Sequence, residues 1–150
     1  MRKRSALGIA VLVGLLVLAT ALPVHAAPVR RLYRGETSQG EMIRFTVART
    51  DAGRFVSRFD LSATLTCEDD TTIGFGISSF LARRELPITD GAFSYDVNWG
   101  DIAVHLAGEL GPLRGDGAAS LVSAQLTSDE QAQLCTTGDL TWTVEFVRTL

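Results

Sequence analysis

Trp99 and its neighbours are the side chains best suited to binding a ligand. Asn98, Trp99 and Asp101 lie around a glycine, and Tyr95 comes four residues before Trp99. Exposed aromatic rings stack on the apolar faces of sugars, and amide and carboxylate groups hydrogen-bond to hydroxyls. We therefore expect a binding surface made by Tyr95, Asn98, Trp99 and Asp101. Core packing is the alternative for Trp99, and Trp142, in the middle of an alternating apolar run, is predicted to be a core residue.

The densest acidic cluster is Glu68-Asp69-Asp70, directly after Cys67. Hard oxygen ligands of this kind on a loop bind Ca²⁺. The spacing lacks the Asp-x-Asp-x-Asp-Gly register of a dedicated calcium loop, and solvated turn residues are the alternative. Glu68, Asp69 and Asp70 are the candidate metal ligands, with Ca²⁺ as the ion, and we expect no other cofactor.

His105 is the only histidine after residue 26. A Ser-His-Asp triad needs a nucleophile beside the histidine, and the sequence contains no Gly-x-Ser-x-Gly motif. Zinc needs three or four His or Cys ligands, and we expect the two cysteines of this region to be used in a disulfide. We expect His105 to be a partly exposed strand residue and predict no catalytic residue.

Composition excludes several classes of protein. The 150 residues are 46% hydrophobic and 21% charged, with a formal net charge of −3, which excludes collagen-like, low-complexity and multi-span membrane chains. Residues 27–150 contain 11 arginines, no lysine and 17 acidic residues, so this part is more acidic still. A chain of this charge does not suit a polyanionic partner, and we expect no binding to nucleic acid.

The first 26 residues have the order of a secretory signal. Residues 2–4 are basic, residues 6–22 carry no charge, and Val24-His25-Ala26 provides small-type residues for a signal peptidase. We expect residues 1–26 to be a cleaved signal peptide and residues 27–150 to be a single secreted, extracellular domain without membrane contact after cleavage. An uncleaved membrane anchor is the alternative, because the apolar run is near the lower limit for a bilayer span.

Two cysteines remain after residue 26, Cys67 and Cys135. In an oxidising compartment the default state of such a pair is a disulfide. The chain-entropy model assigns roughly 4 kcal/mol of stability to a bond that closes a loop of this length. We predict a Cys67–Cys135 disulfide, with two free buried thiols as the alternative.

Hydrophobic residues of the region after residue 26 recur with period two, which is typical of strands with one buried and one wetted face. Gly and Asp turn signals separate these short runs. The fold is predicted to be all-β, an antiparallel β-sandwich of the jelly-roll or immunoglobulin-like kind, with a partly closed barrel as the alternative. A capping-box spacing between Thr127 and Glu130 predicts one short helical turn near residues 127–134.

Several short stretches spread over most of residues 27–150 resemble a known group of proteins. They are Tyr33-Arg34-Gly35-x-Thr37-x-x-Gly40, Ile43-x-Phe45-x-Val47, Cys67, Pro87-Ile88-x-x-Gly91-x-Phe93, and Cys135-Thr136-x-Gly138 with Trp142. They are similar to small, functionally uncharacterised secreted β-rich proteins of high-GC Gram-positive bacteria. The resemblance implies export, a disulfide and a β fold, and implies no functional residue.

Together these features favour a secreted, non-catalytic binding domain for a carbohydrate, such as a polysaccharide, or for another cell-surface ligand. A secreted protein-interaction or inhibitor domain that uses an exposed edge strand or loop is the alternative. A small hydrolase with two convergent carboxylates is the third hypothesis.

Overall fold

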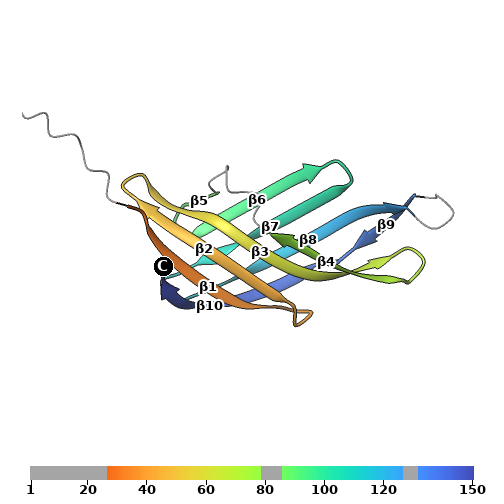
Figure 1. Ribbon diagram of the computed structural model, residues 1–150, viewed down its shortest axis with the longest axis horizontal. Coiled ribbons are helices and arrows are strands. Elements are labelled where there is room, and N and C mark those ends of the chain that lie inside the picture. Colours follow the sequence, from red (N-terminus) through yellow and green to blue (C-terminus); the bar gives the residue numbers. More distant parts are fainter. Residues whose placement is uncertain (1–26, 79–85, 127–131) are drawn as a thin grey trace, which may run out of the picture.

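The computed structural model describes residues 27–78, 86–126 and 132–150 (Figure 1). Every regular element in these ranges is a β-strand. The ten strands are β1 (Val29–Thr37), β2 (Met42–Thr50), β3 (Gly53–Cys67), β4 (Thr72–Ser78), β5 (Leu86–Ile88), β6 (Ala92–Trp99), β7 (Ile102–Leu110), β8 (Arg114–Leu126), β9 (Ala132–Thr136) and β10 (Leu140–Thr149). The prediction of an all-β antiparallel fold is confirmed.

The strands form one sheet that folds over on itself. The hydrogen-bonded order is β10-β1-β2-β3-β9-β8-β7-β6, all neighbouring pairs are antiparallel, and β4 and β5 pair with β3. β10 also pairs with β8, which links the two halves of the sheet directly. In Figure 1 the strands β1, β2 and β3 lie in front of β6, β7 and β8. Strands β10, β1, β2, β3, β9 and β8 thus form a closed ring, and the single sheet wraps round to give two facing layers with sandwich-like packing.

The core lies between these layers and is dominated by aromatic rings. Phe45 on β2 lies 5.5 Å from Phe93 on β6 and 4.9 Å from Trp142 on β10, measured between ring centroids. Phe59 on β3 faces Tyr95 on β6 at 6.1 Å. Since β2 and β3 are not neighbours of β6 in the sheet, these contacts join the two layers. Trp142 is 1% exposed, which confirms it as a core residue.

Two glycines make the space that Trp142 fills. Gly108 on β7 and Gly117 on β8 are directly opposite each other, and Gly117 is also opposite Trp142. A Cβ atom on either glycine would lie within 2.5 Å of the indole ring. The indole Nε1 donates a hydrogen bond to the carbonyl of Ala118 at 3.1 Å, so the polar atom of the buried ring is satisfied. Side chains at positions 108 and 117 would therefore displace the central aromatic group.

The predicted disulfide between Cys67 and Cys135 is confirmed. Cys67 ends β3, Cys135 lies in β9, and the two residues are directly opposite each other in the sheet. β9 pairs with β8 on its other side, so the covalent bond joins one layer to a strand of the other. The bond closes a loop with a sequence separation of 68 residues.

The helical turn predicted near residues 127–134 is wrong where the structure describes it. Residues 127–131 lie outside the described residues, and Ala132–Thr136 form β9. A helix of two turns has little stability of its own, and pairing with both β3 and β8 outweighs the local preference. In the described parts of the chain no helix has the length and apolar character needed to cross a bilayer.

Candidate functional site

The structure does not bring the four residues of the predicted binding surface together. Tyr95 is 7% exposed and lies in the core, and Trp99 is partly buried against the core at the end of β6. Asn98 is exposed on the other face of the same strand, and Asp101 is exposed in the turn between β6 and β7. The two rings therefore face inward, while the polar groups face solvent.

The acidic cluster Glu68-Asp69-Asp70 forms the exposed turn between β3 and β4. The Asp69 carboxylate accepts hydrogen bonds from the side chain and the backbone of Thr71, and these bonds lower its pKa. Glu68 accepts a hydrogen bond from the backbone of Leu134 at 3.3 Å. Among the residues that the structure describes, no three His, Cys, Asp or Glu side chains are grouped so as to hold a metal ion. Asp69 and Glu68 are thus used to shape the turn and attach it to β9.

A row of polar side chains that the sequence did not suggest crosses the outer face of β6, β7 and β8. His105 is directly opposite Asp96 on one side and Ser120 on the other. Its Nδ1 lies 2.6 Å from the Asp96 carboxylate, and both side chains are largely exposed. A catalytic serine needs a hydrogen bond to its base, and the described residues show none between Ser120 and His105. The row is a set of cross-strand contacts over a shallow depression of about 140 Å³.

Asp60 on β3 is a buried carboxylate held by two arginines. Its side chain is 7% exposed and lies 2.7 Å from Arg44 and 3.2 Å from Arg58. The Ser78 hydroxyl donates a third hydrogen bond at 2.7 Å. Burial alone would raise the pKa of Asp60, but the hydrogen bonds from Ser78, Arg44 and Arg58 hold it below its ordinary value. The hydrogen bonds and ion pairs of this cluster thus satisfy the Asp60 carboxylate from within the protein.

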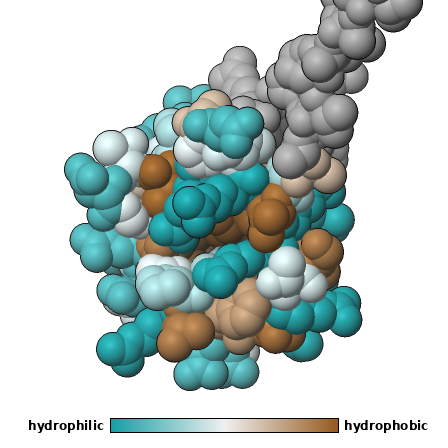
Figure 2. Space-filling model, turned by 90° about the vertical axis from the view of Figure 1, so that its left-hand side faces the viewer, coloured by the Kyte–Doolittle hydropathy of each residue, from teal (hydrophilic) through white to brown (hydrophobic). Residues whose placement is uncertain are grey.

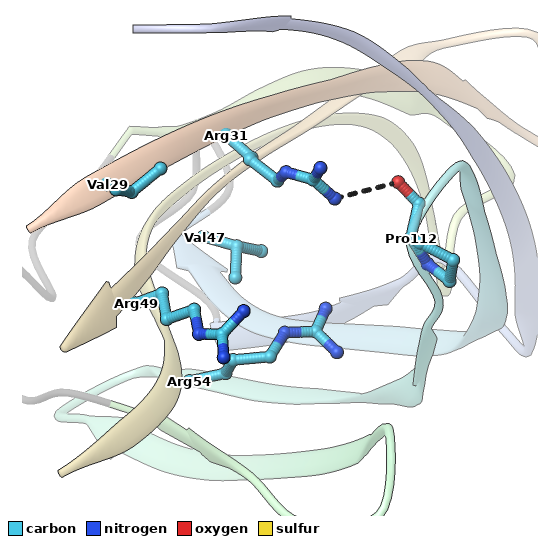
Figure 3. A pocket seen from close by; sticks show the side chains of 6 residues that line it. All are labelled: Val29, Arg31, Val47, Arg49, Arg54 and Pro112. Atoms are coloured by element: carbon cyan, nitrogen blue, oxygen red, sulfur yellow. Dashed lines mark hydrogen bonds between the residues drawn. The ribbon is translucent and has the colours of Figure 1, made fainter. Parts of the chain in front are cut away.

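A pocket with three arginines opens at the end of the sandwich where β1 starts and β10 ends (Figures 1 and 3). Its volume is about 580 Å³, and the described residues that line it are Val29, Arg31, Val47, Arg49, Arg54 and Pro112. Figure 2 looks onto this end, where hydrophilic groups lie over a deeper hydrophobic area. Figure 3 shows Arg49 and Arg54 side by side, with Arg31 across the pocket beside Pro112.

Neighbouring strands place these side chains. In each strand the arginine continues the alternation of buried residues, since Arg31 is two residues from Tyr33, Arg49 two from Val47, and Arg54 two from Val56. The inward-facing positions thus change from apolar to arginine at the same end of β1, β2 and β3. Val47, 2% exposed, forms part of the floor of the pocket where the core ends.

Backbone carbonyls of the β7–β8 connection fix two of the three arginines. Arg54 donates to the carbonyl of Leu110 at 2.9 Å, and Arg31 donates to that of Pro112 at 3.1 Å. The Arg31 guanidinium also lies 5.0 Å from the centre of the Phe146 ring. A guanidinium has five N–H donors, so both groups keep donors for a ligand. The guanidinium group of Arg49 makes no hydrogen bond within the described parts of the chain.

The charges in the pocket are not balanced by the described part of the protein. Arg49 and Arg54 are directly opposite each other in the β2–β3 pair, and like charges in such a position repel. No ion pair within the described ranges involves Arg31, Arg49 or Arg54, and none of the described lining residues is acidic. The pocket therefore offers three positive charges and several N–H donors to an anion.

Comparison with known proteins does not relate the pocket to a known binding site. Searches of protein-family models, curated proteins and solved structures found no match for the chain.

Proposed function

We propose that the protein is a non-catalytic binding domain that recognises an anionic group of its ligand in the arginine pocket. The observation that supports this is the convergence of Arg31, Arg49 and Arg54 on one cavity without a described carboxylate to neutralise them. Guanidinium groups match the geometry of carboxylate, sulfate and phosphate oxygens. In an acidic chain such a concentration of positive charge favours a specific anion site.

Binding rather than catalysis fits the side chains of the pocket. Its described lining consists of arginine, valine and proline. Arginine stays protonated at all ordinary pH values, so it holds an anion but does not exchange protons with it. A nucleophile, a general base and a general acid are all missing from the described lining residues.

The ligand class that the sequence favoured, a carbohydrate or another cell-surface ligand, is compatible with this site if the ligand is acidic. The proposed site is at the other end of β6 and β7 from Trp99, because Leu110, which accepts a hydrogen bond from Arg54, ends β7 whereas Ile102 is opposite Trp99. We therefore move the proposed binding site from Trp99 to the arginine pocket. The Cys67–Cys135 disulfide supports a place of action outside the reducing cytoplasm.

The test is isothermal titration of the purified protein with sulfate, acetate, a uronic acid and a neutral sugar. We expect the anions to bind and the neutral sugar not to bind. Arg49→Ala removes a guanidinium that makes no described hydrogen bond, so it should weaken anion binding and leave the fold intact. Arg34→Ala is the matched control, because Arg34 is exposed on the same sheet and is not among the described lining residues. Equal losses in both variants, or binding of the neutral sugar alone, would contradict the proposal.

A protein-interaction domain is the second candidate, and it is favoured by the edge of the sheet at β4. Among the described strands, β4 pairs with β3 alone, so its outer edge has no described partner strand. A free edge accepts an extended segment of another protein by backbone hydrogen bonds. A defined protein partner whose binding is lost on Phe75→Lys in β4 and unchanged on Arg49→Ala would favour this candidate over the first.

A further inference from the structure

We infer that the ligand of the arginine pocket is a phosphate ester, held by its phosphate group between the arginines and by its organic part against the apolar wall. This inference rests on the proposed function and narrows it to one class of anion. It uses the direction of approach of the three guanidinium groups, the way they are fixed, and the apolar surface beside them.

The three arginines come from three neighbouring strands of the curved sheet and surround one cavity. In Figure 3, Arg31 of β1 lies on one side of Val47, beside Pro112, and Arg49 of β2 and Arg54 of β3 lie on the other side. A carboxylate is planar, and one bidentate guanidinium already uses both of its oxygens. A phosphate group is tetrahedral and has oxygens that point to several sides, so it can accept hydrogen bonds from all three guanidinium groups together. Three guanidinium groups also suit an anion with more than one negative charge.

Two of the arginines are already in place before a ligand arrives. The hydrogen bonds from Arg31 to Pro112 and from Arg54 to Leu110 hold both guanidinium groups against the connection between β7 and β8. Fixing these long side chains in advance reduces the conformational entropy that binding would cost. Arg49, without a described hydrogen bond, is the side chain that is available to close on the phosphate.

The pocket is larger and more apolar than a bare anion needs. Its volume of about 580 Å³ lies within the range of about 300–1,000 Å³ that is usual for sites of organic ligands. Val29, Val47 and Pro112 line it together with the arginines. Among these, Val29 is 53% exposed. An ester can cover these apolar side chains with its organic part, whereas inorganic phosphate leaves them in water.

The first arm of the experiment uses soluble ligands at constant ionic strength. We expect glycerol 3-phosphate to bind at least about tenfold more tightly than acetate, and more tightly than inorganic phosphate. Arg49→Ala should weaken its binding by about tenfold or more, and Arg34→Ala by less than about twofold. Arg49→Lys keeps the charge but lacks the planar fork, so an intermediate loss is expected. Circular dichroism of each variant checks that it is folded.

The second arm separates two sources of the same chemistry, a soluble phosphate ester and a lipid head group. Vesicles of phosphatidylglycerol are compared with vesicles of phosphatidylcholine in a sedimentation assay. Binding of phosphatidylglycerol vesicles that is lost in Arg49→Ala supports a lipid head group as the source. Binding of glycerol 3-phosphate without vesicle binding supports a soluble ester. Either result supports the inference.

The outcomes also distinguish this inference from the proposed function. If acetate and other carboxylates bind as tightly as glycerol 3-phosphate, the phosphate ester is wrong and the anion-binding function stands. If no anion binds, or if Arg49→Ala and Arg34→Ala behave alike, both are wrong.

Discussion

Two pairs of directly opposite residues in β2 and β3 contain arginine, one with an acidic partner and one with a basic partner. Arg44 is directly opposite Asp60, and the two side chains form an ion pair at 2.7 Å. Further along the same ladder, Arg49 is directly opposite Arg54, and neither forms an ion pair with a described carboxylate. The first pair attracts and the second repels. Both pairs join the same two strands, so the difference lies in whether the protein itself provides the negative charge.

The arginines around Asp60 thus have a structural role, whereas those of the pocket have the proposed binding role. At Asp60 the protein provides its own carboxylate, buries it, and closes the site with Arg44, Arg58 and Ser78. At the arginine pocket the protein leaves a cavity of about 580 Å³ beside the like-charged pair. An anion bound in this cavity would relieve the repulsion between the Arg49 and Arg54 guanidinium groups.

The largest expected effect on the unfolding free energy is that of removing the disulfide, which involves neither the Arg44–Asp60 pair nor the Arg49–Arg54 pair. The double variant Cys67→Ala/Cys135→Ala should lose roughly 4 kcal/mol of unfolding free energy, because the unfolded chain is no longer constrained. Since Cys67 lies at the opposite end of β3 from Arg54, and neither cysteine lines the pocket, the affinity for anions should stay unchanged. Urea denaturation and isothermal titration of the same sample check both parts. A parallel loss of affinity would show that the pocket depends on the disulfide and would weaken the comparison.

The next largest effect is expected from Asp60→Ala, which removes the ion pair between Arg44 and Asp60. Asp60→Ala should destabilise the protein by about 1–3 kcal/mol, because Arg44, Arg58 and Ser78 lose a shared buried acceptor. Chemical denaturation measures this cost. The matched change at the repulsive pair, Arg49→Ala, should cost almost nothing in ligand-free protein, and an equal cost at both positions would remove the distinction.

Low pH should destabilise the protein as Asp60→Ala does, but reversibly, because it protonates the Asp60 carboxylate. The pKa of Asp60 is lower in the folded protein than in the unfolded chain, so its contribution to stability is complete above the unfolded pKa and disappears as the pH falls through the folded pKa. Between about pH 5 and pH 2 the unfolding free energy of the wild-type protein should therefore fall more steeply than that of Asp60→Asn. Urea unfolding at several pH values gives both slopes, and parallel slopes would mean that Asp60 is not held ionised by its partners.

The smallest change converts the repulsive pair into a copy of the attractive one. Arg49→Glu places a carboxylate opposite Arg54, so we expect the ligand-free protein to gain about 0.2–1 kcal/mol of stability. The same variant should no longer be stabilised by phosphate, because the cavity now has its own negative charge. Thermal unfolding with and without phosphate provides the readout. A variant that is less stable and still responds to phosphate would show that Arg49 does not face the anion.

Much of the fold could be predicted from the sequence, because period-two alternation reports directly on which face of a strand is buried. Trp142 and the Cys67–Cys135 bond follow from alternation and from cysteine number. The prediction of a helical turn near residues 127–134 was wrong, because local capping signals take no account of the two strands that pair with β9. The closure of β10 on β8 depends on long-range pairing, which a single sequence does not encode in any local pattern.

The candidate site was harder to predict, although part of the signal was present. Alternation already places Tyr95 and Trp99 on one face of β6 and Asn98 on the other, so these residues had no common surface. The turn at residues 51–53 implies a hairpin that sets Arg49 opposite Arg54. The hairpin of β1 and β2 likewise sets Arg31 opposite Val47, next to Arg49 on the same face. What no local pattern shows is that Leu110 and Pro112 lie against these arginines, because this contact joins distant parts of the chain.

The central claim is that the arginines of the pocket, and not those around Asp60, receive an external anion. The most direct measurement is a titration with glycerol 3-phosphate followed by NMR at the Nε–Hε resonances of the arginine side chains. The account predicts saturable shifts for Arg31, Arg49 and Arg54 and none for Arg44 and Arg58. Shifts of equal size in both groups, or shifts confined to Arg44 and Arg58, would contradict it.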